Sequence, residues 1–436
     1  MLHETRFRQR FQAREAEHDP AWGVLLNMVL AMGAIAGETC TESIHAVFYQ
    51  RAKSMLSFDL FGSGKLEVVQ ALILMGGLYL HYCNRPNMAV ATTGAAIRMA
   101  YALGLHRKSP SQLLGGELPP IPNGELEIKR RTWWSLVCVD IWGSTTMGRP
   151  SLGDMFGPAI SVSRMSFDDF KDYPLEEQAP ALTASTMFCQ ISVQIQDKLA
   201  SKPILGLVEA ATFDAQLQHQ YNNLPPLLRS PNRCPTNLLV PRAVIKWKNQ
   251  NARLLLHRPI LLAAALSHKR PPELSIAEQD SILACRTLAA DSIVDIACDW
   301  QPDPICGWHA VWYLFQASMI PLVSLFYEYR NAAECGKWHG QIEMVMRLLQ
   351  SMELWSPVAK RTKDVITELH ESAVLMQSEE QPPRMDRMNM LNMYAQQQMP
   401  FGYDEEWANN TWLNFADWPT FPMEGADFGQ TSMFMG

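Results

Sequence analysis

The sequence predicts an all-α protein, with one large multi-helix domain followed by a tail of different composition. Over most of the 436 residues, apolar side chains recur at the three- and four-residue spacing of amphipathic helices. The sequence contains no long alternation of apolar and polar residues, which would indicate a strand. Glycines and prolines gather between the periodic segments, where they end helices and form loops. A chain of this length also holds ample apolar material for a buried core.

Three local patterns indicate where individual helices lie and how they end. Residues 68–82 are apolar almost all round, which predicts a helix in the centre of the domain. Gly104 directly follows residues 88–103, and a glycine there accepts the left-handed conformation that closes a helix. Ser275 and Glu278 have the spacing of a capping box at a helix start. Further helices are expected at 125–147, 184–198, 205–224, 241–266, 275–298, 309–329, 338–352 and 357–376.

Composition divides the chain into three parts. Residues 1–20 form a charged N-terminal segment, residues 21–376 form the helical domain, and residues 377–436 form an acidic and aromatic tail. From Glu379 onward nine acidic residues stand against two arginines, so the tail carries the whole net charge of -7. The body is balanced and lacks the basic excess that binds nucleic acid phosphates. The tail is expected to be disordered on its own.

The N-terminal segment contains arginines that are cancelled by acidic neighbours. This mixture predicts an exposed helix of mixed charge rather than a phosphate-binding arm. The arginines are Arg6, Arg8, Arg10 and Arg14, and the acidic residues are Glu4, Glu15, Glu17 and Asp19.

The nine cysteines are scattered singly and form no C-x-x-C pair. An odd number without such pairs argues against a secreted disulfide framework, and the first residues lack the layout of a signal peptide. A reducing intracellular compartment is therefore expected. Most of the cysteines fall in apolar periodic segments, where a cysteine behaves as a small buried hydrophobe.

Two segments are free of charge and require a test for membrane spans. A membrane helix needs about 20 predominantly apolar residues. Residues 21–37 fall short of this length and contain Asn27, and residues 310–327 contain Gln316 and Pro321. Both are expected to be buried core helices, so no membrane partner is predicted.

Two neighbouring motifs carry a family resemblance. The first runs over residues 94–107 and ends in Ala-Leu-Gly-Leu-His-Arg, and the second, residues 129–150, joins basic residues to two tryptophans, an aspartate and a final Gly-Arg-Pro. Together they resemble the middle regulatory domain of fungal zinc-cluster transcription factors. Three further stretches are similar to segments of the same domain, and each motif alone would be weak. These are the acidic stretch at 168–174, Leu-Pro-Pro-Leu-Leu-Arg at 224–229 and Leu-Leu-Leu-His-Arg-Pro at 254–259.

The resemblance implies that the motif residues pack the domain and catalyse no reaction. Trp133 and Trp134 would supply large buried area. Arg130 or Arg131 is expected to pair with a carboxylate such as Asp140 across packed helices, because buried charges need a partner. The alternative is a small-molecule sensing pocket lined by the same residues. The residues with this structural role are Arg98, Gly104, Leu105, His106, Arg130, Arg131, Trp133, Trp134, Asp140, Gly148, Arg149 and Pro150.

The family joins this domain to a DNA-binding module that holds two zinc ions between six closely spaced cysteines. Residues 1–60 contain only Cys40, so these residues cannot supply such a module. The chain itself is expected to bind no metal or other cofactor, and to reach DNA indirectly or through a missing module. The resemblance implies a nuclear transcription regulator. The alternative is a co-regulator that binds no DNA and forms a dimer with intact zinc-cluster factors.

The tail has the composition of a transcriptional activation segment. From residue 401 onward it contains no lysine or arginine, and acidic residues alternate with aromatic ones. Trp412, Phe415 and Trp418 have the spacing of one face of a helix that could form in a partner's groove. The predicted partners are therefore the transcription machinery or its co-activators. The alternative is an ordinary terminal segment whose aromatic rings pack back on the body. The expected contact residues are Trp407, Trp412, Phe415, Trp418 and Phe421.

An enzyme is the alternative from a different class. Asp168-Asp169-Phe170-Lys171-Asp172 matches the aspartate-rich motif with which helical terpene synthases bind magnesium diphosphate. Those enzymes need a second metal motif, and the sequence contains none. Signatures of nucleotide-binding, dinucleotide-binding, serine hydrolase and zinc protease sites are also missing or incomplete. The sequence therefore predicts that the chain is not an enzyme.

Overall fold

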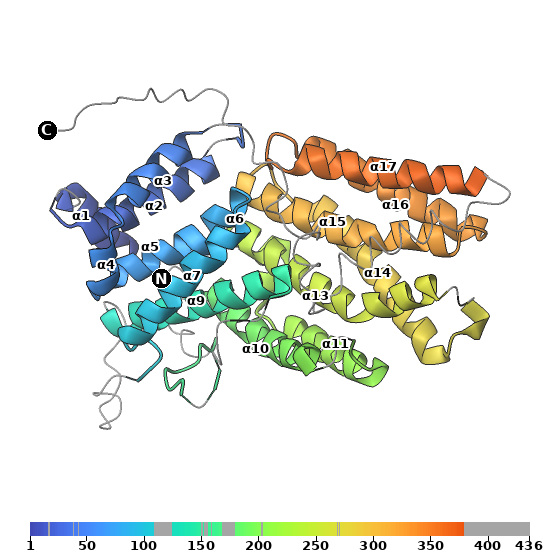
Figure 1. Ribbon diagram of the computed structural model, residues 1–436, viewed down its shortest axis with the longest axis horizontal. Helices are drawn as coiled ribbons and strands as arrows, with labels where there is room; N and C mark the ends of the chain where they lie inside the picture. The colour runs from blue at the N-terminus through green and yellow to red at the C-terminus, as the bar shows by residue number, and fades with distance from the viewer. Residues whose placement is uncertain are drawn as a thin grey trace, which may run out of the picture.

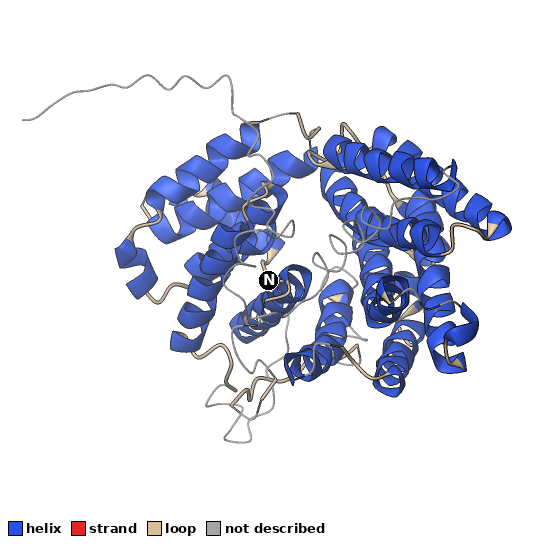
Figure 2. Cartoon of the chain, turned by 45° about the vertical axis from the view of Figure 1, so that its right-hand side comes forward, coloured by secondary structure: helices blue, strands red, loops and turns tan. Residues whose placement is uncertain are grey.

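The structure is a computed structural model that describes residues 1–378 apart from residues 16–17, 38, 42, 109–123, 150, 152–155, 158, 168–178, 202–203, 268 and 270. Within these ranges the secondary structure is helical and contains no strand (Figure 2), so the predicted all-α class is confirmed. The tail from residue 379 onward, with its proposed contact residues Trp407, Trp412, Phe415, Trp418 and Phe421, lies outside the described residues.

The described helices form two groups that lie side by side (Figure 1). The first group contains α1 (Glu4–Gln12), α2 (Pro20–Gly37), α3 (Ile44–Met55), α4 (Phe58–Gly62), α5 (Leu66–Leu74), α6 (Leu80–Tyr82), α7 (Pro86–Ala102) and α9 (Glu125–Met147). The second group contains α10 (Pro180–Ser201), α11 (Leu207–Asn222), α12 (Pro226–Arg229), α13 (Leu239–Leu266), α14 (Ile276–Asp299), α15 (Pro304–Tyr327), α16 (Ala332–Ser351) and α17 (Ala359–Ser378). Because α10 also packs along α9, it connects the two groups.

Helix α15 is the centre of the second group. It packs against α13, α14, α16 and α17, and its side chains form the middle of the largest apolar cluster. By length and composition alone, α2 and α15 could each cross a membrane, but 83% of the apolar window of α15 and 50% of that of α2 are buried inside the protein. Their packing is that of the core helices expected from residues 21–37 and 310–327.

The predicted central helix of the first group is present and contains one irregular turn. α5 continues through a π-helical turn (Met75–Tyr79) into α6 without a break. The continuous helix formed by α5, this turn and α6, called the central rod below, covers the predicted range 68–82. A methyl group added at Gly76 would lie 2.7 Å from Thr93 Oγ1, and one added at Gly77 would lie 2.7 Å from Val139 Cγ1. Gly76 therefore lets the backbone of α7 approach the rod, and Gly77 makes room for the Val139 side chain of α9.

The predicted helix ends are confirmed. Gly104 has a φ of 68°, the amide of Gly104 bonds to Tyr101 O (3.0 Å), and the amide of Leu105 bonds to Ala100 O (3.0 Å). This pair of bonds is the Schellman arrangement, which satisfies the last carbonyls of a helix. Gly148 ends α9 in the same left-handed conformation, with a φ of 61°. At the start of α14, Ser275 Oγ accepts from Glu278 N at 3.3 Å and Glu278 Oε2 accepts from Ser275 N at 2.8 Å.

All nine cysteines are free thiols, as expected for a chain without a disulfide framework. Four of them are buried, and Cys298 is exposed. The sequence analysis did not predict α3 or α4. α3 buries only Tyr49 and Ala52, so its apolar periodicity is weak, and α4 has five residues.

Substitution of Gly77 tests the close approach of α9. Gly77→Ala places a methyl group against Val139 and is expected to lower the free energy of unfolding by about 1–3 kcal/mol. Gly33→Ala is the matched control, because Gly33 is also helical and has no neighbouring atom within 4 Å of an added methyl group. That control is expected to raise stability by about 0.5–1 kcal/mol. Urea unfolding measures both values, and equal effects of the two substitutions would contradict the packing account.

Candidate functional site

The tryptophan pair of α9 lies in the core of the first group. Trp133 and Trp134 are 0% and 1% exposed. Trp134 Nε1 donates to Ser163 O at 3.0 Å, and its ring lies 5.5 Å from that of Phe156. Trp134 thus fixes the segment that follows α9 against the helix.

The two family motifs meet around His106. Its ring lies 4.9 Å from the ring of Tyr101 and 5.9 Å from that of Trp133. Its carbonyl oxygen accepts from Ser161 N (2.9 Å) and Val162 N (3.0 Å). Because Gly104 turns the chain at the end of α7, Leu105 and His106 face inward and are 4% and 7% exposed. The glycine cap, the histidine and the tryptophan pair form one packing unit.

The arginines of the motifs have partners that differ from the expected one. Arg131 Nε lies 2.8 Å from Glu127 Oε1 and Arg130 Nε lies 3.5 Å from Glu127 Oε2, so the pairing predicted across packed helices occurs here within α9. Asp140 is buried at 6% exposure, and it lies nine residues beyond Arg131, about 14 Å along the helix axis. Glu127 was missed because it precedes the motif by one turn.

The remaining motif residues lie at the helix termini or on the surface. Arg98 is exposed on α7 and is not part of the core. Arg149 Nη2 donates to Asn87 Oδ1 at 2.6 Å, which joins the end of α9 to the start of α7. Pro150 lies outside the described residues, as does the acidic stretch with Asp168, Asp169 and Asp172.

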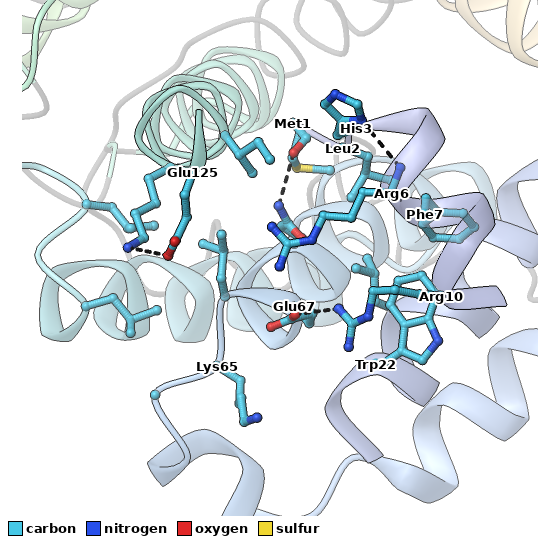
Figure 3. A pocket seen from close by; sticks show the side chains of 18 residues that line it. Met1, Leu2, His3, Arg6, Phe7, Arg10, Trp22, Lys65, Glu67 and Glu125 are labelled. Atoms are coloured by element: carbon cyan, nitrogen blue, oxygen red, sulfur yellow. Dashed lines mark hydrogen bonds and ion pairs between the residues drawn. The ribbon is translucent and has the colours of Figure 1, made fainter. Parts of the chain in front are cut away.

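A cavity of about 350 Å³ opens beside this packing unit, between α1, α5, the end of α7 and the start of α9 (Figure 3). Both apolar and charged side chains line it. The sequence analysis did not predict this cavity, because it is formed by residues from five separate segments. The apolar lining residues are Phe7, Trp22, Leu25, Leu66, Leu103, Leu105 and Ile128, and the charged ones are Arg6, Arg10, Lys65, Glu67, Glu125 and Lys129.

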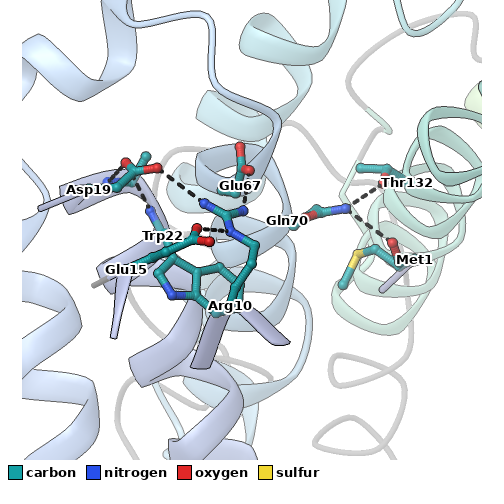
Figure 4. Close-up of polar contacts among 9 residues, drawn as sticks. Met1, Arg10, Glu15, Asp19, Trp22, Glu67, Gln70 and Thr132 are labelled. Carbon is teal, nitrogen blue, oxygen red and sulfur yellow. Dashed lines mark hydrogen bonds and ion pairs between the residues drawn. The ribbon is translucent and has the colours of Figure 1, made fainter. Parts of the chain in front are cut away.

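Arg10 holds α1 over the cavity (Figure 4). Its guanidinium contacts Glu15 (2.5 Å), Glu67 (2.7 Å) and Asp19 (3.2 Å), and it lies 4.3 Å from the centre of the Trp22 ring. Burial opposes the charge of Arg10, but the hydrogen bonds to Glu15 and Glu67 and their negative charges raise its pKa above the ordinary value. The expectation of an exposed helix of mixed charge is therefore wrong for Arg10, whose side chain is only 17% exposed. Its main partner on α5, Glu67, is distant in sequence.

A second polar link lies beside the cavity. The side-chain amide of Gln70, a buried residue of α5, donates to Thr132 Oγ1 (3.2 Å) and to Met1 O (3.1 Å). α5 therefore contacts α9 and the segment before α1 through one side chain (Figure 4).

His257, from the family segment 254–259, belongs to a polar cluster in the second group. Arg253 donates to Asp214 at 2.6 Å, His257 Nδ1 lies 3.0 Å from Ser281 Oγ, and His257 Nε2 lies 3.6 Å from Asp214 Oδ1. Burial would raise the pKa of Asp214, but His257 and Arg253 lower it. Although a serine, a histidine and an aspartate meet here, Ser281 and His257 are both 6% exposed, so the cluster serves packing between α11, α13 and α14.

Aromatic rings join the two groups of helices. The Trp142 ring of α9 lies 5.8 Å from the Trp308 ring of α15, with His81 on one side (5.0 Å) and His309 on the other (6.4 Å). Burial lowers the pKa of His81 to about 4 and that of His309 to about 3, with smaller contributions from Arg149 and Lys248 respectively. Both imidazoles are therefore neutral at physiological pH.

The described residues contain no group of three or more His, Cys, Asp or Glu side chains that could hold a metal ion. The zinc cluster of the family therefore does not fit the residues that the structure describes. The described part of the site is therefore a buried packing unit of helices with a cavity beside it.

Comparison with known proteins gives the class of this protein. A family profile described as "Fungal specific transcription factor domain" matches residues 1–222, just over half of the chain, and the chain belongs to this family.

Several transcriptional regulators are similar to the chain. It is 34% identical over 136 residues to the lactose regulatory protein LAC9 of Kluyveromyces lactis, covering 31% of this chain and 14% of that protein. It is 25% identical over 337 residues to the transcription factor FBD3 of Gibberella moniliformis, covering 69% and 44%. An uncharacterized transcriptional regulatory protein of Schizosaccharomyces pombe is 25% identical over 309 residues, covering 66% and 37%. The matched part thus spans less than half the length of these relatives, and no solved structure matches the chain.

Substitution of Arg10 tests how α1 is held. Arg10→Met removes the charge-assisted contacts to Glu67 and its neighbours, so α1 is expected to detach with a loss of about 1–3 kcal/mol. Hydrogen exchange of the amides in α1 measures this directly. Arg8→Met is the control, because the ion pair of Arg8 with Glu4 is 73% and 77% exposed and contributes little. Equal protection in both variants would contradict the anchoring role.

The junction histidines make stability depend on pH. An unfolded histidine titrates near 6.5, so the unfolded chain takes up protons before His81 and His309 do in the folded protein. The free energy of unfolding therefore falls as the pH drops below about 6.5, by about 1 kcal/mol per histidine at pH 5.5, and levels off below the folded pKa values. Urea unfolding of His81→Gln and His309→Gln is expected to show a smaller fall than the parent. His219→Gln, at an exposed position, is expected to keep the fall unchanged.

Proposed function

We propose that this chain acts in the nucleus as the regulatory and activating portion of a fungal zinc-cluster transcription factor. The family match over residues 1–222 and the names of the relatives as transcriptional regulators support the regulatory role. Nuclear action follows from that role. In this proposal the helical body forms the control domain, and DNA is reached through a zinc-binding module joined to it or through a partner chain.

The tail supplies the activating function. Six acidic residues and no basic residue follow position 401, so mutual repulsion keeps the segment extended and its aromatic rings accessible. Trp412, Phe415 and Trp418 would enter a groove of the transcription machinery or a co-activator as one face of an induced helix. The binding energy of such a segment is concentrated in a few aromatic anchors.

The chain performs no chemical reaction in this proposal and needs no cofactor of its own. The absence of a metal-binding cluster among the described residues and the enclosed position of Ser281 and His257 support this view. The aspartate-rich stretch 168–172 lacks the second motif of a terpene synthase.

A co-regulator that forms a dimer with an intact zinc-cluster factor is the second candidate. Residues 1–60 contain a single cysteine, so they cannot form a zinc cluster themselves, and in this candidate the partner supplies the DNA contact. The two candidates predict different behaviour without an added DNA-binding domain. Only the co-regulator changes the output of a reporter controlled by another zinc-cluster factor and co-purifies with that factor.

A reporter assay tests activation by the tail. The full chain, fused to a heterologous DNA-binding domain, is expected to activate a reporter, and Trp412→Ala with Phe415→Ala and Trp418→Ala is expected to lower the output at least tenfold. The matched control replaces Asn409, Asn410 and Asn414 with alanine in the same segment and is expected to change the output less than twofold. Full output from the aromatic variant at equal protein level would remove the activating role from these residues.

A further inference from the structure

The cavity beside the motif packing unit has the size and lining of a small-molecule site. Its volume of about 350 Å³ lies within the range of roughly 300–1,000 Å³ typical of ligand pockets. Its apolar lining residues include Leu25 of α2, Leu66 of α5, and Leu103 and Leu105 after the end of α7. Such a lining takes up an apolar body and excludes a strongly hydrated ion.

The charged side chains around the opening leave positive charge uncompensated. Lys129 pairs with Glu125 at 2.9 Å, and Arg10 pairs with Glu67 at 2.7 Å. The side chains of Arg6 and Lys65 make no hydrogen bond or ion pair with any described residue, and both are exposed; the charge of Arg6 adds to the lowering of the pKa of Glu125, for which Lys129 is the main cause. Arg6 extends from α1 into the space between α5 and α9 (Figure 3).

We infer that this cavity binds an organic anion: a small molecule with an apolar ring or chain in the cavity and one carboxylate or sulfonate at the opening. Arg6 would hold the acid group, because a guanidinium bonds a planar carboxylate through two donors. Lys65 would add a second charge from the other edge of the opening. The two unpaired cations match one or two negative charges.

Ligand binding at this place would also act on α1. Arg6, Phe7 and Arg10 all lie on α1, so the ligand contacts the helix that closes the cavity as well as the fixed helices α5 and α9. A ligand that binds only the closed arrangement stabilises it in proportion to its concentration. The contacts of Arg10 and the ligand would therefore both hold α1 in place. Binding of the organic anion would thus change the position or mobility of α1.

Two fluorescent probes of nearly equal shape test the inference on the purified full chain. 8-Anilinonaphthalene-1-sulfonate carries an acid group on an apolar ring system, and N-phenyl-1-naphthylamine lacks that group. The sulfonate is expected to bind saturably at one site and to be displaced by octanoate, but not by octanol at the same concentration. Arg6→Gln with Lys65→Gln is expected to weaken the sulfonate about tenfold or more and the neutral probe less than twofold.

The control variant carries the same change of charge elsewhere. Arg8→Gln with Lys53→Gln alters two exposed cations that do not line the cavity, and it is expected to change sulfonate binding less than twofold. Circular dichroism and the unfolding midpoint establish that both variants are folded. Hydrogen exchange of α1 with octanoate is expected to show increased protection.

Three results would overturn the inference: absence of saturable sulfonate binding, equal weakening in both double variants, or equal binding of the two probes. A fourth result would identify the acidic tail as the occupant of the cavity. If removal of residues 379–436 strengthens sulfonate binding tenfold, the cavity belongs to the tail and not to a small molecule. The reporter assay for activation does not use this cavity, so a failure here leaves the proposed function standing.

Discussion

The close approach of α7 and α9 to the glycine pair of the central rod positions the rest of the first group. With any side chain at Gly76 or Gly77, the rod would push Thr93 or Val139 away, and the tryptophan pair of α9 would leave its place. Because cores are packed at crystal density, a shift of one helix passes to its neighbours. The π turn at Met75–Tyr79 adjusts the rod locally where both neighbours contact it. The cavity between α5, α7 and α9 has its shape because these three helices cannot move apart independently.

The features that the sequence predicted are those determined by local chemistry. A left-handed glycine after an apolar helix fixes the end of α7 at Gly104, and a serine three residues before a glutamate fixes the start of α14. The central rod was evident because it is apolar all round. Contacts between distant segments were not predictable: the pairing of Arg10 with Glu67 joins residues 57 positions apart. The carboxylate that pairs with Arg130 and Arg131, Glu127, lies one turn away on the same helix, and it was not predicted because it precedes the motif.

The family motifs and the cavity lie in the same region but have different roles. Motif residues such as Leu105, His106 and Trp133 are buried and build the frame, whereas the charged side chains that line the cavity, apart from Lys129, come from segments outside the motifs. A domain organised in this way can keep its frame while the residues at the opening change. Relatives that share the frame could therefore respond to different molecules, in the same way that loops on a rigid scaffold diversify binding.

The packing of α11 against α13 has a practical consequence for anyone dividing this chain. The family profile ends at residue 222, but the side-chain amide of Asn249 in α13 bonds to the carbonyl of Leu217 at 3.0 Å inside the protein, and α10 packs on both α9 and α13. Cutting the chain at the profile boundary would expose the buried side chains of Phe213 and Leu217 and leave an exposed apolar surface on each piece. The smallest portion that keeps these contacts therefore extends past the matched range, through α13 and the helices that enclose it.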